Sequence, residues 1–165
     1  MELMRPRFRF ALVLMAGLPV AAALAAAPDR PVAPSTPQAP PGTLAPPSVV
    51  AEIQQSLDAA IARFDAMDGA GVLAHVSEQY RTGPLTKAGI AEQLRAVFAI
   101  HDQVRARVRI DEVRLVGEHA WVYSTGDVTG RLRYIGGAVQ VLSWEHELEV
   151  ARRENGRWRL FGYQR

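Results

Sequence analysis

The spacing of apolar residues changes once along this chain, near His101. Before that point apolar residues recur every three or four positions, which is the period of an α-helix with one buried side. After it they alternate with polar residues, which is the period of a β-strand with one buried face. Because helical and strand segments are separated along the chain, the pattern predicts an α+β fold with helices on one face of a curved antiparallel sheet.

Three N-terminal helices are expected. The first starts at Ser48, which can cap it, and ends at Asp68–Gly69; the second covers about 70–78. The third follows Thr86, another capping residue. The apolar stripe of the first helix is wide, as in a helix packed along a sheet, and consists of Val50, Ile53, Leu57, Ile61 and Phe64.

A four-stranded meander is expected after the helices, with strands at about 103–116, 119–133, 139–152 and 157–165. The apolar row changes phase at Asp111–Glu112, which predicts a β-bulge that preserves one buried face and bends the strand. A tight turn at Gly117–Glu118 then pairs Leu115 with Ala120.

The alternation also selects the remaining registers. A three-residue loop at 136–138 places Gly130 opposite Trp144, and an aromatic ring over a glycine is a favourable cross-strand pair. A three-residue loop with Gly156 as bulge glycine places Trp158 on the face of Val150. A two-residue Asn-Gly loop would instead place it on the face of a row of glutamates, so the three-residue loop is preferred.

The first 47 residues are expected to lie outside this domain. Residues 1–25 resemble a secretory signal peptide, with three arginines, an apolar run and an Ala-x-Ala cleavage site at Ala23–Ala25. An uncleaved membrane anchor is the alternative. Residues 26–47 form a proline-rich linker. The folded domain is then 48–165, and the mature protein is expected to be periplasmic or secreted, without stable membrane insertion.

Charge and composition exclude several classes of function. The signal holds three Arg and one Glu, and without it sixteen basic and sixteen acidic residues remain. A neutral chain is not expected to bind nucleic acid. There is no cysteine, so there is no disulfide, thiol nucleophile or cysteine metal site. The four histidines lack metal-ligand spacing, and no metal or cofactor is expected.

Three segments carry a resemblance to a known family: the long first helix (Ile53–Asp68), the His119–Val122 segment after a Gly-Glu turn, and the ending Glu154–Leu160. On these segments the chain resembles the nuclear transport factor 2-like superfamily. The match covers about 50–165 and implies a cone-shaped fold, shared by polyketide cyclase-like and ketosteroid isomerase-like proteins. Members include enzymes, binding modules and scaffolds. The usual hairpin between the second and third helices has only Tyr80–Thr86 available here, which implies a more open mouth. No aspartate matches the isomerase base.

One histidine interrupts the apolar row of the third strand. Leu142, Trp144, Leu148 and Val150 alternate with glutamates and a serine, and His146 stands among them. Strict alternation predicts that His146 faces the helices, as a ligand-binding residue or general base. The alternative is a neutral core histidine bonded to Gln164 and a backbone group. The expected ligand-binding residues are His146, Trp144, Gln164, Tyr80 and Phe98; His146 is the candidate catalytic residue.

Aromatic residues are expected on the outer face of the sheet: Trp121, Tyr123, Phe161 and Tyr163. Exposed aromatics favour a protein partner, so a homodimer through this face is predicted. Beside them, Arg107 is expected opposite Asp127 in a ladder of surface charges.

Three functions remain open on these grounds. The preferred one is an exported non-catalytic module that binds a small apolar ligand or a partner protein. The second is a small exported isomerase, lyase or hydrolase that uses His146 in the cone. The third is a structural or scaffold role at the cell envelope.

Overall fold

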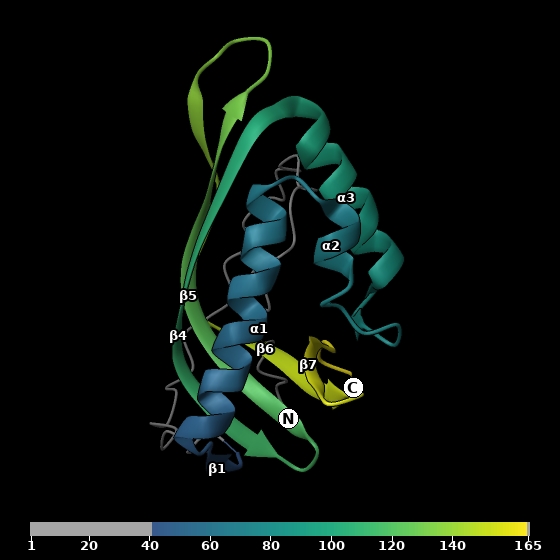
Figure 1. Cartoon of the computed structure of the whole chain (residues 1–165), viewed down its shortest axis with the longest axis vertical. Helices are drawn as coiled ribbons and strands as arrows, with labels where there is room; N and C mark the ends of the chain where they lie inside the picture. Colours follow the sequence, from purple (N-terminus) through teal and green to yellow (C-terminus); the bar gives the residue numbers. More distant parts are fainter. Residues whose placement is uncertain (1–40, 165) are drawn as a thin grey trace, which may run out of the picture.

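The computed structural model describes residues 41–164, which form helices packed against the concave side of a curved sheet (Figure 1). The helices are α1 (Pro47–Asp65), α2 (Gly69–Leu73) and α3 (Lys87–Ile100). The strands are β1 (Thr43–Leu44), β2 (Arg81–Thr82), β3 (Leu85–Thr86), β4 (His101–Val116), β5 (His119–Leu132), β6 (Ala138–Glu154) and β7 (Arg157–Leu160). The α+β prediction is confirmed. The predicted signal peptide and most of the linker lie outside the described residues.

The main sheet is antiparallel, in the order β1-β4-β5-β6-β7. Strand β1 was not predicted. Thr43 pairs with Leu115 at the edge of β4. The folded region therefore begins before residue 48, because the end of the expected linker supplies this edge strand. The predicted start of the first helix is wrong as well. Pro46 is the N-cap and Pro47 is the first helical residue, so Ser48 lies inside the helix and does not cap it.

The other two helices are held by side-chain caps. The backbone N–H of Gly71 donates to Asp68 at 2.9 Å, and that of Gly89 donates to Thr86 at 3.4 Å, as predicted for Thr86. Helix α2 ends at Leu73 instead of 78. The reason is that the next residues pair with β7: the N–H of Ser77 donates to the carbonyl of Leu160 at 2.8 Å.

The connection between α2 and α3 contains a short hairpin after all. Arg81 pairs with Thr86 and Thr82 with Leu85, around a turn in which Gly83 has a φ of +53°. Seven residues suffice because each strand is only two residues long.

The first bulge lies where the sequence predicts it. The register of β4 against β5 shifts between Ile110 and Glu112, so Asp111 is the extra residue. The predicted pairs of Leu115 with Ala120 and of Arg107 with Asp127 are confirmed. These pairs keep the apolar row of β4 directed at α1.

The bulge at Glu145–His146 in β6 was not predicted. Trp144 pairs with Gly126 and Glu147 with Ser124, so Glu145 and His146 both lie opposite Thr125. His146 has a φ of +47°, in the left-handed region. The extra residue reverses the phase of the strand. Trp144 still faces the helices, but beyond the bulge Glu147 and Glu149 share the inner face, and Leu148 and Val150 share the outer face.

This bulge also overturns the predicted loop of the last hairpin. The last hairpin turns on two residues, Asn155 and Gly156, both with positive φ, and pairs Trp158 with Arg153. The expected three-residue loop is wrong because the face it was chosen to match had already been reversed. The predicted loop at 136–138 is wrong for a different reason: Arg131 pairs with Ala138, so the loop is longer, and the register shifts again between Gln140 and Leu142. Trp144 therefore covers Gly126 instead of Gly130, and His101 covers Gly130.

The core has two parts joined along α1. One lies between the helices and the middle of the sheet, around Phe64, Ile90, Val104 and Trp144. The other lies where α1 crosses the start of β5 and the last hairpin, around Ile53, Val113, Ala120 and Trp158. Between these parts the concave face is incompletely filled.

Candidate functional site: the cone cavity

A cavity of about 180 Å³ lies between α1, α2 and the concave face of the sheet. Its wall is mainly apolar and includes Leu57, Phe64, Val108 and Trp144. A few polar residues also line it, namely Ser56, His75, Ser124, Glu149 and Arg159. An apolar pocket with a few convergent polar groups is the usual form of a small-molecule site.

Ser56 of α1 and His75, just after α2, meet at one wall of the cavity. The Ser56 hydroxyl donates to the carbonyl of Trp158 at 2.8 Å, and its oxygen lies 3.4 Å from Nδ1 of His75. Since the single hydroxyl hydrogen is used on Trp158, the favoured arrangement has Nδ1–H of His75 donating to Ser56. The other ring nitrogen, Nε2, is then an acceptor in the neutral ring.

The surroundings of His75 oppose its charged form. Burial lowers the pKa of His75 from its usual value, and the guanidinium groups of Arg159, Arg63 and Arg157 lower it further. The neutral imidazole is therefore favoured near neutral pH. A neutral ring with a free acceptor nitrogen can bind a ligand donor or take up a proton.

Glu149 provides the carboxylate of the cavity. It pairs with Val122 across the sheet, and its Oε1 is buried. The negative charge of Glu149 also affects Tyr80, which is 2% exposed. Burial raises the pKa of the Tyr80 hydroxyl, and the nearby charge of Glu149 raises this pKa further. On the same strand as Glu149, Nε1 of Trp144 donates to the hydroxyl of Ser124 on the neighbouring strand at 3.1 Å. The inner face thus holds a carboxylate among apolar and aromatic side chains.

The structure places the predicted ligand-binding residues in different regions. Trp144 lines the cavity, as expected. Tyr80 is buried in the adjacent core, and Phe98 packs on Phe64 with ring centroids 5.6 Å apart. Gln164 is exposed, and its side-chain amide donates to the carbonyl of Gln79, so it is not a neighbour of His146.

The prediction that His146 faces into the cone is wrong. The β6 bulge turns the histidine to the outer face, where its side chain is 61% exposed. Its ring stacks on Tyr123 with centroids 4.9 Å apart, and Nδ1 lies 3.6 Å from Oδ2 of Asp111. Its backbone N–H donates to the Thr125 hydroxyl at 3.0 Å. His146 therefore has no direct access to the cavity.

The outer face carries most of its predicted aromatics, but not all are exposed. Trp121 and Tyr163 are partly buried and meet edge to face at 5.7 Å, whereas Phe161 is 7% exposed beneath Arg152. The C-terminal segment after β7 accounts for this, because the N–H groups of Phe161 and Gly162 both donate to the carbonyl of Val150. A homodimer through this face stays a prediction, which sedimentation analysis can check.

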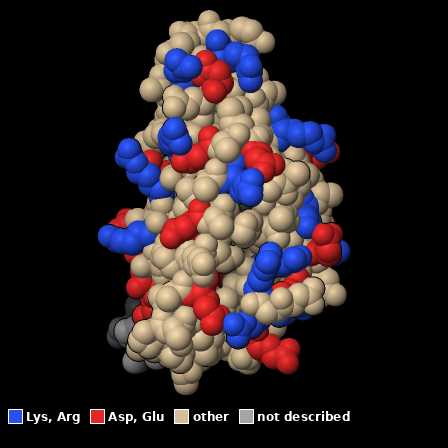
Figure 2. Space-filling model, in the orientation of Figure 1, with Lys and Arg blue, Asp and Glu red and all other residues tan. Residues whose placement is uncertain are grey.

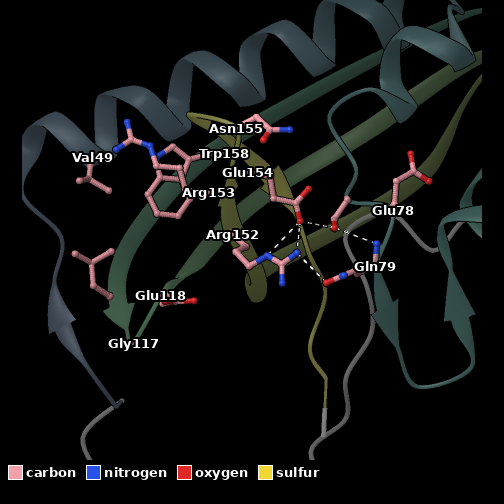
Figure 3. A pocket seen from close by; sticks show the side chains of 12 residues that line it. Val49, Glu78, Gln79, Gly117, Glu118, Arg152, Arg153, Glu154, Asn155 and Trp158 are labelled. Atoms are coloured by element: carbon pink, nitrogen blue, oxygen red, sulfur yellow. Dashed lines mark hydrogen bonds and ion pairs between the residues drawn. The ribbon is translucent and has the colours of Figure 1, made fainter.

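A second, open hollow of about 810 Å³ lies at the hairpin end of the molecule (Figure 3). Its charged groups bond mainly to one another. Arg152 donates to Glu154 and, at 2.9 Å, to Gln79, while Ser77 donates to Glu154 at 2.6 Å. Bonding to Ser77 and Arg152 lowers the pKa of Glu154 although burial opposes it. This network is consistent with a structural role in joining the last hairpin to residues 77–79.

The surface charge is mixed. On the face shown in Figure 2, basic and acidic side chains are interspersed over the helices. Within residues 41–164, no group of three or more histidine and acidic side chains is arranged to hold a metal ion. No helix of this region is both long and apolar enough to cross a membrane.

Solved structures of low sequence identity share this arrangement of helices and sheet. A conserved protein from Planctomyces limnophilus superposes with a TM-score of 0.61 at 14% identity, covering 70% of this chain and 92% of its own. A provisionally named scytalone dehydratase from Novosphingobium aromaticivorans gives 0.60 at 12% identity, covering 70% and 80%. A ketosteroid isomerase-like protein from Erwinia carotovora atroseptica gives 0.55 at 21% identity, covering 70% and 93%.

No protein-family model matches the sequence, and no curated protein is similar to it. At these identities the structural likeness establishes the fold and not the activity. The chain shares the fold of these proteins, which is the cone-shaped fold that the resemblance to the nuclear transport factor 2-like superfamily implies.

His75 and Glu149 are the site residues that the sequence pattern did not reveal. His75 lies in a segment without a regular pattern, and strict alternation places Glu149 on the outer face with the other glutamates of its strand. A signal for Glu149 was present: the Asn-Gly dipeptide favours a two-residue turn, which places Trp158 on the face of Glu149.

The lowered pKa of His75 predicts a pH-dependent stability. Because the folded pKa lies below the unfolded value, this contribution is complete above the unfolded pKa, near 6.5, and is lost as pH falls towards the folded pKa. We expect His75→Gln to lose less stability than the wild type between pH 7.5 and pH 5 in urea titrations. His119→Gln, on the outer face, is the control; an unchanged pH dependence in His75→Gln would contradict the assignment.

Proposed function

We propose that this protein is an exported module that binds a small, largely apolar molecule in the cone cavity. The supporting observation is the apolar cavity itself, lined by Trp144 and Phe64 with few polar groups. Its volume of about 180 Å³ bounds the ligand. An apolar cavity of roughly 150 Å³ in another protein accepts benzene, so the buried part of the ligand is about one ring in size.

Export rests on the sequence of residues 1–25, which has the basic, apolar and Ala-x-Ala regions of a signal peptide. On this basis the domain works in the periplasm or outside the cell. Intact-mass measurement on protein from the native host is expected to show residues 1–25 removed, and retention of Met1 would indicate an anchor instead.

The binding proposal is tested with benzene as the probe. Saturable shifts of the indole N–H resonances of Trp144 and Trp158, which both line the cavity, are expected in NMR titrations. Ala60→Phe adds a ring at the cavity wall and is expected to abolish these shifts. Ala62→Phe, exposed on the same helix, should leave them unchanged. Absence of saturable binding to the wild type, or equal binding to Ala60→Phe, would overturn the proposal.

A lyase or isomerase is the second candidate, and one observation favours it. The same cavity contains a carboxylate, Glu149, and a histidine, His75, whose neutral form is stabilised. Such a pair can remove a proton from one atom of a bound molecule and return it to another. The names of the scytalone dehydratase and ketosteroid isomerase-like neighbours belong to the same broad class of chemistry.

Proton transfer is tested separately from binding. Cyclohexanone is a ring-sized carbon acid whose α-hydrogens exchange with solvent deuterium. An acid–base site is expected to accelerate this exchange by about 10²–10⁴-fold, and Glu149→Gln to remove the acceleration while leaving benzene binding intact. No acceleration by the wild type would leave binding as the supported function.

A further inference from the structure

An outer groove of about 400 Å³ lies between α1 and β7, beside the cone cavity. Ser56, His75, Trp158 and Arg159 line both the groove and the cavity. The contact of 3.4 Å between Ser56 and His75 therefore lies where the two spaces meet. These two side chains therefore form part of the boundary between the cavity and the groove.

The groove presents positive charge from β7. Arg157 and Arg159 both line it, and both add to the positive potential at His75. Among the described residues, Glu52 is the one acidic residue in its wall, and its Oε2 already accepts from Arg153 at 2.6 Å and from Nε1 of Trp158 at 3.0 Å. The negative charge of Glu52 is thus directed to other partners, and the groove retains a basic character.

Arg159 carries a buried donor that the protein does not use. Its Nε is buried and has no hydrogen-bond partner within residues 41–164. A buried guanidinium N–H without an acceptor is costly, because it has lost water and gained nothing in return. An acceptor oxygen of a bound molecule would satisfy it, and a carboxylate or another oxyanion would form the stronger, charge-assisted bond.

The groove is the more basic of the two spaces. Arg159 lines both, but Glu149 lines only the cavity and Arg157 lines only the groove, so an anion is repelled by Glu149 inside and attracted by both arginines on the groove side. A ligand that has an apolar body and a negative group is therefore oriented, with its body in the cavity and its anion outside.

We propose that the outer groove is the mouth of the cone and an anion-binding subsite, so that the ligand is a small apolar molecule carrying one oxyanion group. This inference rests on the proposed binding function for the position of the apolar part. Arg159 binds the oxyanion through Nε–H, and Arg157 adds charge at the entrance. Ser56 and His75 part to admit the apolar body.

Three probes separate the parts of the inference. Benzene measures binding in the cavity alone, acetate measures binding in the groove alone, and 3-phenylpropionate measures binding in both together. The uncharged analogue of 3-phenylpropionate is 3-phenylpropanol. Affinities are measured by NMR titration on the wild type, Arg159→Gln and Arg157→Gln, with Arg95→Gln as the control because its side chain is exposed on α3. Inorganic sulfate, used beside acetate, distinguishes a carboxylate site from a general oxyanion site.

The wild type is expected to bind 3-phenylpropionate about ten- to a hundredfold more tightly than 3-phenylpropanol, the range of a charge-assisted hydrogen bond. Arg159→Gln should remove most of this preference and Arg157→Gln a smaller part, while Arg95→Gln keeps it. Benzene binding should be the same in the wild type, Arg157→Gln and Arg95→Gln; because Arg159 also lines the cavity, its variant is judged by the ratio of its affinities for 3-phenylpropionate and 3-phenylpropanol. A bound carboxylate should also raise the pKa of His75, measured on its ring resonances.

The outcomes distinguish this inference from the proposed function. Equal binding of 3-phenylpropionate and 3-phenylpropanol, with benzene binding retained, overturns the anion subsite and leaves the cavity function standing. Arg159-dependent binding of acetate without benzene binding supports the subsite and overturns the cavity function. A charge preference that persists in both Arg159→Gln and Arg157→Gln places the anion elsewhere and overturns the inference.

Discussion

Replacement of Trp144 by alanine is expected to lower the free energy of unfolding by about 3–5 kcal/mol. The indole is 8% exposed, belongs to the main core cluster and covers Gly126 on the neighbouring strand. Its removal empties a large volume next to an existing cavity and leaves the Ser124 hydroxyl without its donor. Urea titrations of the purified variants measure the loss.

Glu145→Ala is the matched control, because Glu145 is exposed on the same strand one residue away. Its loss should stay below about 1 kcal/mol. Similar losses for the two variants would show that Trp144 does not point into the core, and the position of the β6 bulge would then be wrong.

The sequence determined the fold more fully than the site. The change of period near His101 is a property of many residues together, so a local irregularity does not alter the fold that it predicts. The bulge at Asp111 could be predicted because the apolar row itself changes phase there, from Ile110 to Val113. Both features are visible in the identity of the residues.

The bulge in β6 left no such trace. On both sides of His146 the residues alternate between glutamate and a large apolar residue, so either phase looks like a strand with one buried face. The chain directs Glu149 inward and Leu148 outward, against the usual preference. A polar residue on the inner face is tolerated where a cavity is lined for function, and there the apolar pattern loses its predictive value.

The remaining site residues could not be paired from sequence for a different reason. Ser56 and His75 are brought together by the packing of α1 against the segment after α2, and Arg159 joins them from the edge strand β7. The pairing of Leu160 with His75 and Ser77 fixes this contact, through backbone groups that any residue carries. No side-chain pattern encodes it.

Gly126→Ala tests the same part of the sheet from the opposite side. A Cβ at this position would lie 2.5 Å from the carbonyl oxygen of Arg107 and 2.5 Å from the ring of Trp144. The carbonyl belongs to the paired strand β4, and the ring is held by its bond to Ser124, so neither can move freely. We expect a loss of about 1–3 kcal/mol from overpacking, measured by urea titration.

Gly137→Ala provides the comparison, because a Cβ there would meet nothing within 4 Å and the backbone is not left-handed. That substitution should be neutral or stabilise by about 0.4–1 kcal/mol, through the lower entropy of the unfolded chain. Combining Gly126→Ala with Trp144→Ala should cost less than the two single losses together, since the truncated side chain no longer opposes the new methyl group. Additive losses would show that the ring of Trp144 does not cover Gly126. The register of β6 against β5 would then be different, and Glu149 would not be placed in the cavity.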